Sequence, residues 1–264
     1  MGWSAPCPSV AEMEAERRRL DQAMVERGLA DSRSRARALI EAGLVTIDGT
    51  PADKPSRTVA PDADIVLTGL DHPWVSRGGV KLVHALDHFA IAVAGRVALD
   101  IGASTGGFTD VLLARDAARV YAVDVGHDQL APRLRADPRV VVLERLNARY
   151  LTAVEVPERV GLLVSDASFI GLETLLPACL DRAAPGADLV ALIKPQFEVG
   201  PGLVGKGGVV KDPALHRATC QRISDWLDAR PGWRVLGLTE SPIRGPDGNV
   251  EFLIHARRTD GDEA

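Results

Sequence analysis

The chain contains 264 residues, 46% hydrophobic and 25% charged, a composition typical of a globular protein with one or two domains. It contains no run of about 18 apolar residues, so a membrane-spanning helix is not expected. The net charge of −5 gives no general attraction to nucleic acid, but residues 17–59 hold nine Lys/Arg against six Asp/Glu.

The start of the chain and its cysteines predict a cytoplasmic protein. The first fifteen residues, MGWSAPCPSVAEMEA, lack the basic start and apolar core of a secretion signal. Cys7, Cys179 and Cys220 are far apart and lack metal-ligand spacing, so we expect ordinary thiols in a reducing compartment and no metal site.

The first predicted elements are two short helices followed by strands. Leu20, Ala23 and Met24 follow helical spacing, and Gly28 is placed to end that helix. Ser32 is suited to cap a second helix, whose buried face and end are predicted at Ala36, Leu39, Ile40 and Gly43. The segment LVTIDGTPADKP then predicts a strand, an Asp-Gly turn and a strand, and ADIVLTG predicts a further strand.

This small unit resembles the S4-type RNA-binding domain through RLDQAMVERGLADSRSRARALIEAGLVTIDG. That family holds folded RNA with its second helix and the following loop, through phosphates and shape. The resemblance implies RNA contacts at Arg33, Arg35, Arg37 and Lys54. Pairing of the arginines with Glu41 or Asp31 on the helix surface is the alternative.

The tripeptide Arg19-Leu20-Asp21 also occurs as a catalytic motif in some pseudouridine synthases, which carry the same accessory domain. Here Asp21 falls inside the first predicted helix, where this tripeptide is ordinary for the S4-type fold. We therefore assign it no catalytic role.

The segment LDHPWVSRGGVKL, residues 70–82, joins the small unit to the rest of the chain. Pro73 restrains His72 to an extended conformation. Trp74 is expected to pack between the parts, with stacking on RNA as the alternative. We expect an S4-type domain over 16–70, a linker over 71–79 and a second domain over 80–258.

In the second domain apolar runs of strand length alternate with helical stretches. The predicted strands are VALDIG, RVYAVDVG, RVVVLE, VGLLVSD and ADLVALIKP, and the predicted helices cover 107–115, 168–183 and 213–230. This alternation predicts an α/β, Rossmann-like domain, with a mostly parallel sheet covered by helices on both faces. WRVLGLTESPI and NVEFLIHARR predict a closing antiparallel pair. Ligands of such sheets gather at the carboxyl ends of the strands, where Asp100, Asp124, Asp166 and Lys194 lie.

The glycine-rich turn in DIGASTGGFTD lets a ligand come close to the backbone. GASTGG is not GxGxxG, and it lacks the Gly-Lys-Ser/Thr of a phosphate loop. Asp124 follows Gly102 by 22 residues and is placed to accept hydrogen bonds from a ribose diol, in NAD or in any adenosine cofactor. Asp100 disfavours a pyrophosphate but tolerates a cationic sulfonium, so S-adenosylmethionine is the better fit.

The second domain resembles the FtsJ-like 2′-O-methyltransferases, and the chain over roughly residues 16–258 resembles the TlyA family, sometimes labelled haemolysin A. The motifs are SRGGVKL, DIGASTGGFTD, VSDASFI, LIKPQFE, GKGGVV and SPIRGPDGNVEFL. The resemblance implies 2′-O-methylation of ribosomal RNA, at cytidines, with ribosomal subunits as partners and no membrane. It places the methionine part of S-adenosylmethionine against Asp100, Gly102, Ser104, Thr105, Gly106, Gly107 and Phe108, the ribose on Asp124, and the adenine edge on Asn147.

The same resemblance implies a catalytic Lys-Asp-Lys-Glu set at Lys81, Asp166, Lys194 and Glu251. A lysine at the pocket floor can orient the ribose hydroxyl and stabilise charge developing on it, or accept its proton if the lysine pKa is lowered. We assign Lys194 the principal role with Asp166 as its partner, while Lys81 and Glu251 orient the ribose. Glu240 is the nearest competitor to Glu251.

Two further features are interpreted as RNA contacts. Phe169 is expected to stack on a flipped nucleotide, with core packing as the alternative. The glycine-rich segment FEVGPGLVGKGGVVKDP is interpreted as a loop that closes over RNA, with Lys206 and Lys211 near phosphates. Two other functions stay open: a membrane-active haemolysin, and a non-catalytic RNA-binding factor with a vestigial cofactor pocket.

Overall fold

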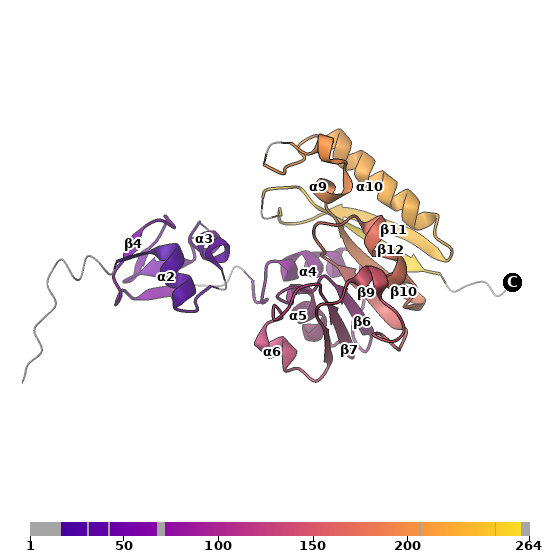
Figure 1. The fold of residues 1–264 in the computed structure, drawn as a ribbon, viewed down its shortest axis with the longest axis horizontal. Coiled ribbons are helices and arrows are strands. Elements are labelled where there is room, and N and C mark those ends of the chain that lie inside the picture. The colour runs from indigo at the N-terminus through magenta and orange to yellow at the C-terminus, as the bar shows by residue number, and fades with distance from the viewer. Residues whose placement is uncertain are drawn as a thin grey trace, which may run out of the picture. The chain divides into compact units, whose positions relative to one another are not determined.

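The computed structural model describes residues 17–30, 32–41, 43–67, 72–205, 207–245 and 247–259 (Figure 1). The chain divides into two compact units between Pro73 and Trp74.

The first unit packs two helices against short strands around its own apolar core. Its elements are β1 (Arg18–Arg19), α2 (Leu20–Glu26), α3 (Arg33–Glu41), β2 (Val45–Ile47), β3 (Thr50–Pro51), β4 (Thr58–Val59) and β5 (Ile65–Leu67). One sheet has the order β3-β2-β5, and β1 pairs with β4. Ser32 Oγ accepts a hydrogen bond from the Arg35 amide at 3.2 Å, which confirms the predicted cap. Asp48 and Gly49 have φ values of 50° and 75°, the left-handed pair that a two-residue hairpin turn requires.

Asp21 is fully buried and holds the start of this unit together. It accepts two hydrogen bonds from Arg19, each of 2.9 Å, and a third from Arg33 at 3.3 Å. The Arg19 bonds lower the pKa of Asp21 to about 2 against the opposing effect of burial, and Arg33 adds to the lowering. A carboxylate committed to two arginines in this way is structural, as the sequence analysis concluded.

The second unit is built on a seven-stranded sheet with helices on both faces (Figure 1). In sheet order its strands are β11 (Trp233–Glu240), β12 (Phe252–Arg258), β10 (Ala183–Ile193), β9 (Val160–Ser165), β6 (Val97–Ile101), β7 (Arg119–Val123) and β8 (Val140–Leu143). The strands from β10 to β8 are parallel, whereas β12 runs antiparallel to β10 and to β11. The predicted Rossmann-like sheet with a closing antiparallel pair is confirmed.

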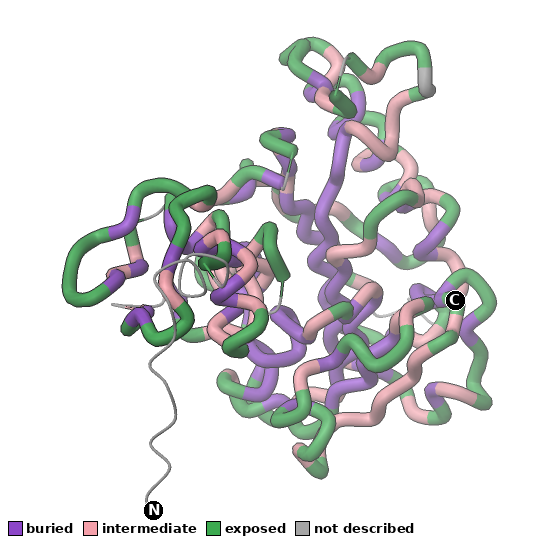
Figure 2. Tube along the Cα trace, turned by 60° about the vertical axis from the view of Figure 1, so that its left-hand side comes forward, coloured by how far each residue is buried: buried purple, intermediate pink, exposed green. Residues whose placement is uncertain are grey.

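The helices cover the two faces because successive side chains of each strand point to opposite sides. The helices are α4 (Gly78–His88), α5 (Gly107–Ala114), α6 (Pro132–Arg135), α7 (Leu172–Leu175), α8 (Pro177–Leu180), α9 (Pro195–Glu198) and α10 (Pro213–Asp228), with 3-10 turns η1 (Ala148–Tyr150) and η2 (Pro201–Leu203). Leu99 and Ile101 of β6 pack with α7, α8 and α10, and Ala98 packs with α4 and α5. The central strands of this unit are buried (Figure 2).

The predicted helix over 168–183 is wrong in its extent. Two short helices, α7 and α8, replace it, because Pro177 lacks an amide hydrogen and begins a new turn. Residues 166–171 form a loop instead, in which Phe169 has φ 66°. Strand β10 begins at Ala183, four residues before the predicted strand, and is irregular between Ala183 and Asp188. Among the described residues no helix is long and apolar enough to cross a membrane.

The Asp21 network gives a pH prediction. Because the folded-state pKa is depressed, the stabilisation is present above the unfolded pKa of about 3.9 and is lost as the pH falls toward about 2. Its size is about 1–2 kcal/mol, since both arginines are exposed enough for screening by solvent. Asp21→Asn should therefore expose the α2 amides to hydrogen exchange at pH 6 but change little at pH 2. Asp53→Asn, at an exposed site, is the control, and equal exchange in Asp21→Asn and wild type at pH 6 would contradict the network.

Candidate active site

Four charged side chains from distant parts of the chain meet at the carboxyl ends of β9 and β10. Lys81 Nζ lies 2.6 Å from Glu251 Oε2 and 3.6 Å from Asp166 Oδ2. Lys194 Nζ lies 2.7 Å from Asp166 Oδ1. Asp166 therefore bridges the two lysines, and positive and negative groups alternate through the cluster.

The cluster is largely removed from water. Lys81, Lys194 and Glu251 are only 6%, 7% and 1% exposed. Buried charges are stable only when they are paired, and two lysines and two carboxylates compensate each other completely. The cluster is thus an electrically neutral set of groups held at fixed positions.

Strand register explains why residues so far apart in sequence meet here. Ile193 at the end of β10 pairs with Phe252 at the start of the antiparallel β12, so Lys194 and Glu251 lie just beyond the paired positions. Ala191 of β10 pairs with Ser165 at the end of the parallel β9, which brings Asp166 to the same edge. Lys81 reaches this edge from the first turns of α4.

The glycines before Lys81 allow α4 to approach the site closely. A Cβ atom on Gly107, the first residue of α5, would lie 3.0 Å from the Gly79 amide nitrogen, closer than side-chain carbons normally come. A Cβ on Gly78 would lie 3.4 Å from Asp166 Oδ2. The motifs SRGGVKL and STGGF therefore pack the starts of α4 and α5 directly against each other beside Asp166.

Lys194 is held by more than its carboxylate partner. Its Nζ donates to the Asp166 carbonyl oxygen at 3.0 Å and to Ser168 Oγ at 2.9 Å. Strand β10 ends at Ile193 and α9 begins at Pro195, so the chain turns at Lys194 as the proline predicts. The Lys194 ammonium group therefore has a defined position at the carboxyl end of β10.

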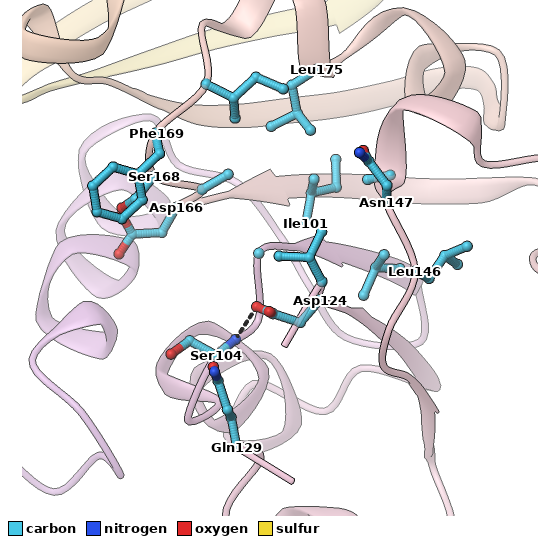
Figure 3. Close-up of a pocket in the computed structure, with 16 residues that line it drawn as sticks. Ile101, Ser104, Asp124, Gln129, Leu146, Asn147, Asp166, Ser168, Phe169 and Leu175 are labelled. Atoms are coloured by element: carbon cyan, nitrogen blue, oxygen red, sulfur yellow. Dashed lines mark hydrogen bonds between the residues drawn. The ribbon is translucent and has the colours of Figure 1, made fainter. Parts of the chain in front are cut away.

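A cavity of about 490 Å³ adjoins the cluster and shares Asp166 and Ser168 with it (Figure 3). One part of its wall is apolar, formed by Ile101, Val123, Leu146 and Leu175. Another part is polar, formed by Ser104, Asp124, Gln129 and Asn147. Asp124 accepts hydrogen bonds from the amides of Ser104 at 2.8 Å and Gly126 at 2.6 Å, which fixes its carboxylate at the cavity floor. The size and lining suit a nucleoside-sized ligand.

Comparison with known proteins identifies the family. Residues 74–258 match the model of the FtsJ-like methyltransferase family, and residues 18–65 match that of the S4 domain. A Mycobacterium tuberculosis protein named 16S/23S rRNA (cytidine-2′-O)-methyltransferase TlyA is 54% identical over 244 residues, which are 92% of this chain and 91% of that protein. The chain belongs to the TlyA family of FtsJ-like methyltransferases.

Two further relatives are named as hemolysins. Hemolysin A of Brachyspira hyodysenteriae is 39% identical over 239 residues, 90% of this chain and 98% of that protein. A solved structure of a Streptococcus thermophilus protein, provisionally named a hemolysin, has a TM-score of 0.73 and 39% identity, and covers 93% of this chain and 90% of that one.

The structure sorts the predicted cofactor residues of this TlyA-family chain into two groups. Gly102, Ser104, Asp124 and Asn147 line the cavity. The others are not part of the cavity lining: Gly106 caps α5 with φ 98°, Gly107 and Phe108 are buried in the first turn of α5, and Thr105 is half-buried before them. Gly102 has φ 84°, and a Cβ there would lie 2.8 Å from Ala167 Cα, so only glycine fits at this point of the loop.

Asp100 is fully buried below the loop. Its Oδ2 accepts a hydrogen bond from Thr109 at 2.7 Å, whereas its Oδ1 is buried with no hydrogen-bond partner among the described residues. Burial raises the pKa of Asp100 to about 7, helped by the charges of Asp166 and Asp124 and opposed by the Thr109 hydrogen bond. Asp100 therefore lies beneath the loop, contacts α5 through Thr109 and is not part of the cavity lining.

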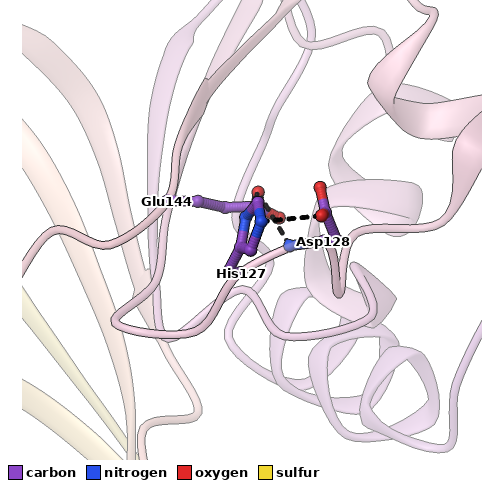
Figure 4. A group of neighbouring side chains, drawn as sticks. All are labelled: His127, Asp128 and Glu144. Atoms are coloured by element: carbon purple, nitrogen blue, oxygen red, sulfur yellow. Dashed lines mark hydrogen bonds and ion pairs between the residues drawn. The ribbon is translucent and has the colours of Figure 1, made fainter.

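A second group of polar side chains organises the loop after Asp124 (Figure 4). His127, Asp128 and Glu144 place metal-ligating atoms within 4.8 Å of one another. Both Glu144 oxygens are already used, since they accept from the amides of Asp128 at 3.0 Å and Gln129 at 3.2 Å and from Arg135 at 2.6 Å. Burial opposes its ionisation, but the Asp128 amide, the Arg135 guanidinium and the Leu130 amide together lower the pKa of Glu144 to about 2. The group is an anchor for the cavity-lining loop, with a guanidinium supplying the positive charge.

The predicted RNA contacts have different environments. Arg37, Lys54 and Lys211 are exposed, and Arg33 is exposed and hydrogen-bonds Asp21 at 3.3 Å, whereas Asp31 lies outside the described residues. Arg35 contacts His72, with 3.3 Å between Nη2 and Nε2. Lys206 lies outside the described residues.

Phe169 is 89% exposed, so core packing is wrong for it, and its ring lies 5.0 Å from that of Phe197. Trp74 packs against Gly79 at the start of α4, within the second unit.

Sequence reasoning missed several residues of the site. Ser168 holds Lys194, and Gln129, Leu146, Ile170 and Leu175 line the cavity. Ser168 lies in the quoted motif VSDASFI, two residues after the predicted Asp166, and could have been noticed there as a hydroxyl near the site. The cavity-wall residues carry no pattern of their own, because their place depends on how loops after β7, β8 and β9 fold back over the sheet.

Asp100 gives a second pH prediction. Its pKa is raised on folding from about 3.9 to about 7, so the free energy of unfolding should fall as the pH rises through this interval, by about 4 kcal/mol at most. The Asp100→Asn variant lacks this dependence of the free energy of unfolding on pH. The exchange protection of the β6 amides should therefore rise in Asp100→Asn relative to wild type between pH 5 and pH 7.5. Asp247→Asn, at an exposed position, should show no such change, and parallel profiles for Asp100→Asn and wild type would contradict the assignment.

Proposed function

We propose that this chain transfers the methyl group of S-adenosylmethionine to the 2′-hydroxyl of cytidine riboses in ribosomal RNA. The observation that carries the proposal is the convergence of Lys81, Asp166, Lys194 and Glu251 beside a nucleoside-sized cavity. The relatives named as rRNA (cytidine-2′-O)-methyltransferases support the substrate class.

The cavity fits the proposed cofactor. Asp124 accepts one amide hydrogen bond on each oxygen and retains lone pairs for a ribose diol. Ile101, Val123 and Leu146 offer apolar walls to an adenine ring, with Asn147 at the edge. Asp124, which is paired with backbone amides and with no cation among the described residues, gives the cavity a negative charge that suits a cationic ligand. When bound, S-adenosylmethionine supplies an electrophilic methyl group on a positively charged sulfur.

The cluster then acts on the acceptor hydroxyl. Lys194 Nζ, fixed by Asp166 and Ser168, would exchange its hydrogen bond to Ser168 Oγ for one to the ribose oxygen. Its positive charge stabilises the negative charge that develops on this oxygen as the methyl–oxygen bond forms and the hydroxyl proton leaves to water. Lys81, held between Glu251 and Asp166, contributes positive charge from the other side. Fixing the hydroxyl in line with the methyl carbon supplies much of the acceleration, because a 1 Å misplacement can cost about 100-fold in rate.

RNA contacts are proposed on both units. In the S4 domain Arg33, Arg35, Arg37 and Lys54 would contact phosphates, and in the second unit Lys211 would do so beside the catalytic edge. Among these residues Arg37, Lys54 and Lys211 offer exposed positive charge. Lys206 belongs to the same proposal by its place in the glycine-rich segment.

The test of catalysis is Lys194→Ala. We expect it to reduce methyl transfer at least 100-fold while S-adenosylmethionine still binds, since Lys194 is not part of the cavity wall. The measurement is a map of 2′-O-methyl groups on ribosomal RNA from cells with wild type, Lys194→Ala or no protein. Arg234→Ala, an exposed change on β11, is the control. Full methylation by Lys194→Ala would refute the catalytic assignment, and an unchanged map without the protein would refute the function.

Phe169 supplies a test of substrate binding. A non-glycine residue with φ 66° and a ring exposed to water is costly, by about 1–3 kcal/mol for the backbone alone, so it indicates a functional position. We propose that its ring stacks on the target base, which is worth about 1–3 kcal/mol. Phe169→Ala should raise KM for RNA about 5- to 100-fold, whereas Phe169→Tyr should not. Unchanged KM in the alanine variant would contradict the stacking role.

A further inference from the structure

A buried carboxylate links two loops of the active site. Glu198, the last residue of α9, has a side chain only 3% exposed. Its Oε1 accepts a hydrogen bond from the Leu172 amide at 2.8 Å, and its Oε2 accepts one from Arg222 Nη2 at 2.9 Å. Arg222 projects from α10 and also donates to the Glu198 carbonyl oxygen at 3.1 Å.

The two loops carry the reacting edge of the site. The loop over residues 166–171 follows β9 and holds Asp166, Ser168 and Phe169. The segment over 194–198 follows β10 and holds Lys194 and Phe197. The Glu198 side chain reaches from the segment over 194–198 to the Leu172 amide, which directly follows the loop over 166–171. One side chain therefore controls the separation of both partners of the Lys194–Asp166 pair.

The surroundings of Glu198 are shaped for this contact. A Cβ on Gly171 would lie 3.2 Å from Glu198 Oε2, so the glycine leaves room for the carboxylate against the loop. Glu173, in the first turn of α7, pairs with the same Arg222 guanidinium. Arg222 thus contacts both segments at once, through Glu173 on one side and Glu198 on the other.

Burial makes this link rigid. A carboxylate so deeply buried must keep its partners, because an unpaired buried charge is strongly destabilising. The Arg222 guanidinium serves Glu173, the Glu198 carboxylate and the Glu198 carbonyl together from one planar fork of donors, which holds these three acceptors at fixed positions. A lysine in its place would satisfy fewer of these acceptors.

We propose that Glu198 and Arg222 are positioning residues that set the spacing between the loop over 166–171 and α9. They thereby fix Lys194 against Asp166 and Ser168, and Phe169 against Phe197. Neither residue touches the cavity, so they act on the reaction only through the groups they hold. This inference rests on the proposed methyltransferase function.

The test uses the full chain and compares Glu198→Gln, Arg222→Gln, the double variant and Arg222→Lys. Arg217→Gln is the matched control, because it is an exposed arginine on the same helix with no described partner. The measurements are kcat and KM for RNA methylation, the dissociation constant of S-adenosylmethionine and the melting temperature.

We expect kcat to fall tenfold or more in Glu198→Gln and in Arg222→Gln, with the cofactor dissociation constant changed less than threefold. The double variant should lose no more than the single ones, because both remove the same link. Arg222→Lys, which keeps the charge, should show a smaller fall in kcat at an unchanged melting temperature. If a glutamine variant does not fold, the positioning role is tested with Arg222→Lys instead.

Two results would overturn the inference. The first result is an active wild type with kcat unchanged in both Glu198→Gln and Arg222→Gln. If the glutamine variants do not fold, an unchanged kcat in Arg222→Lys counts as the same result. In either case the positioning role is wrong and the methyltransferase function stands. If wild type itself methylates no RNA, the proposed function fails and this inference fails with it.

Discussion

The active edge of this protein depends on charge compensation among two lysines and two carboxylates, of which Lys81, Lys194 and Glu251 are almost out of contact with water and Asp166 is partly exposed. Asp166 bridges Lys81 and Lys194, and Glu251 neutralises the far side of Lys81. Removing one member would leave a buried charge without its partner, at a cost of about 3–5 kcal/mol. The same contacts therefore determine both the catalytic geometry and the local stability. The sheet register that aligns β12 with β10 makes these contacts possible.

Carboxylates also hold the loops around that edge. Glu144 accepts backbone amides from the loop after β7, and Glu198 accepts the Leu172 amide after the loop over 166–171. Asp21 has a comparable place in the S4 domain, where two arginines surround it. In each case an arginine balances the acid. Short loops that carry functional groups gain fixed positions in this way without a helix or strand of their own.

Close backbone approach is the second structural requirement. Gly107 lets α5 begin directly against the start of α4, and Gly102 lets the loop after β6 pass against Ala167. Because α4 carries Lys81 and the Ala167 segment carries Asp166, these glycines determine how near the lysine comes to its carboxylate. The glycine-rich motifs thus serve the packing of the site as much as the contact with a ligand.

The alternation of strands and helices, the Rossmann-like fold and the S4 domain could be predicted from the sequence, because strand-length apolar runs, caps and turns are local patterns, whereas the break between α7 and α8 was missed. The sequence also indicated the four charged residues through motifs, although Lys81 and Glu251 are 170 positions apart. Only the tertiary structure decided that Asp100 lies beneath the loop, that Phe169 faces water, and that Ser168 and Glu198 hold their neighbours. Those facts depend on strand register and loop packing, which bring together residues that no local spacing relates.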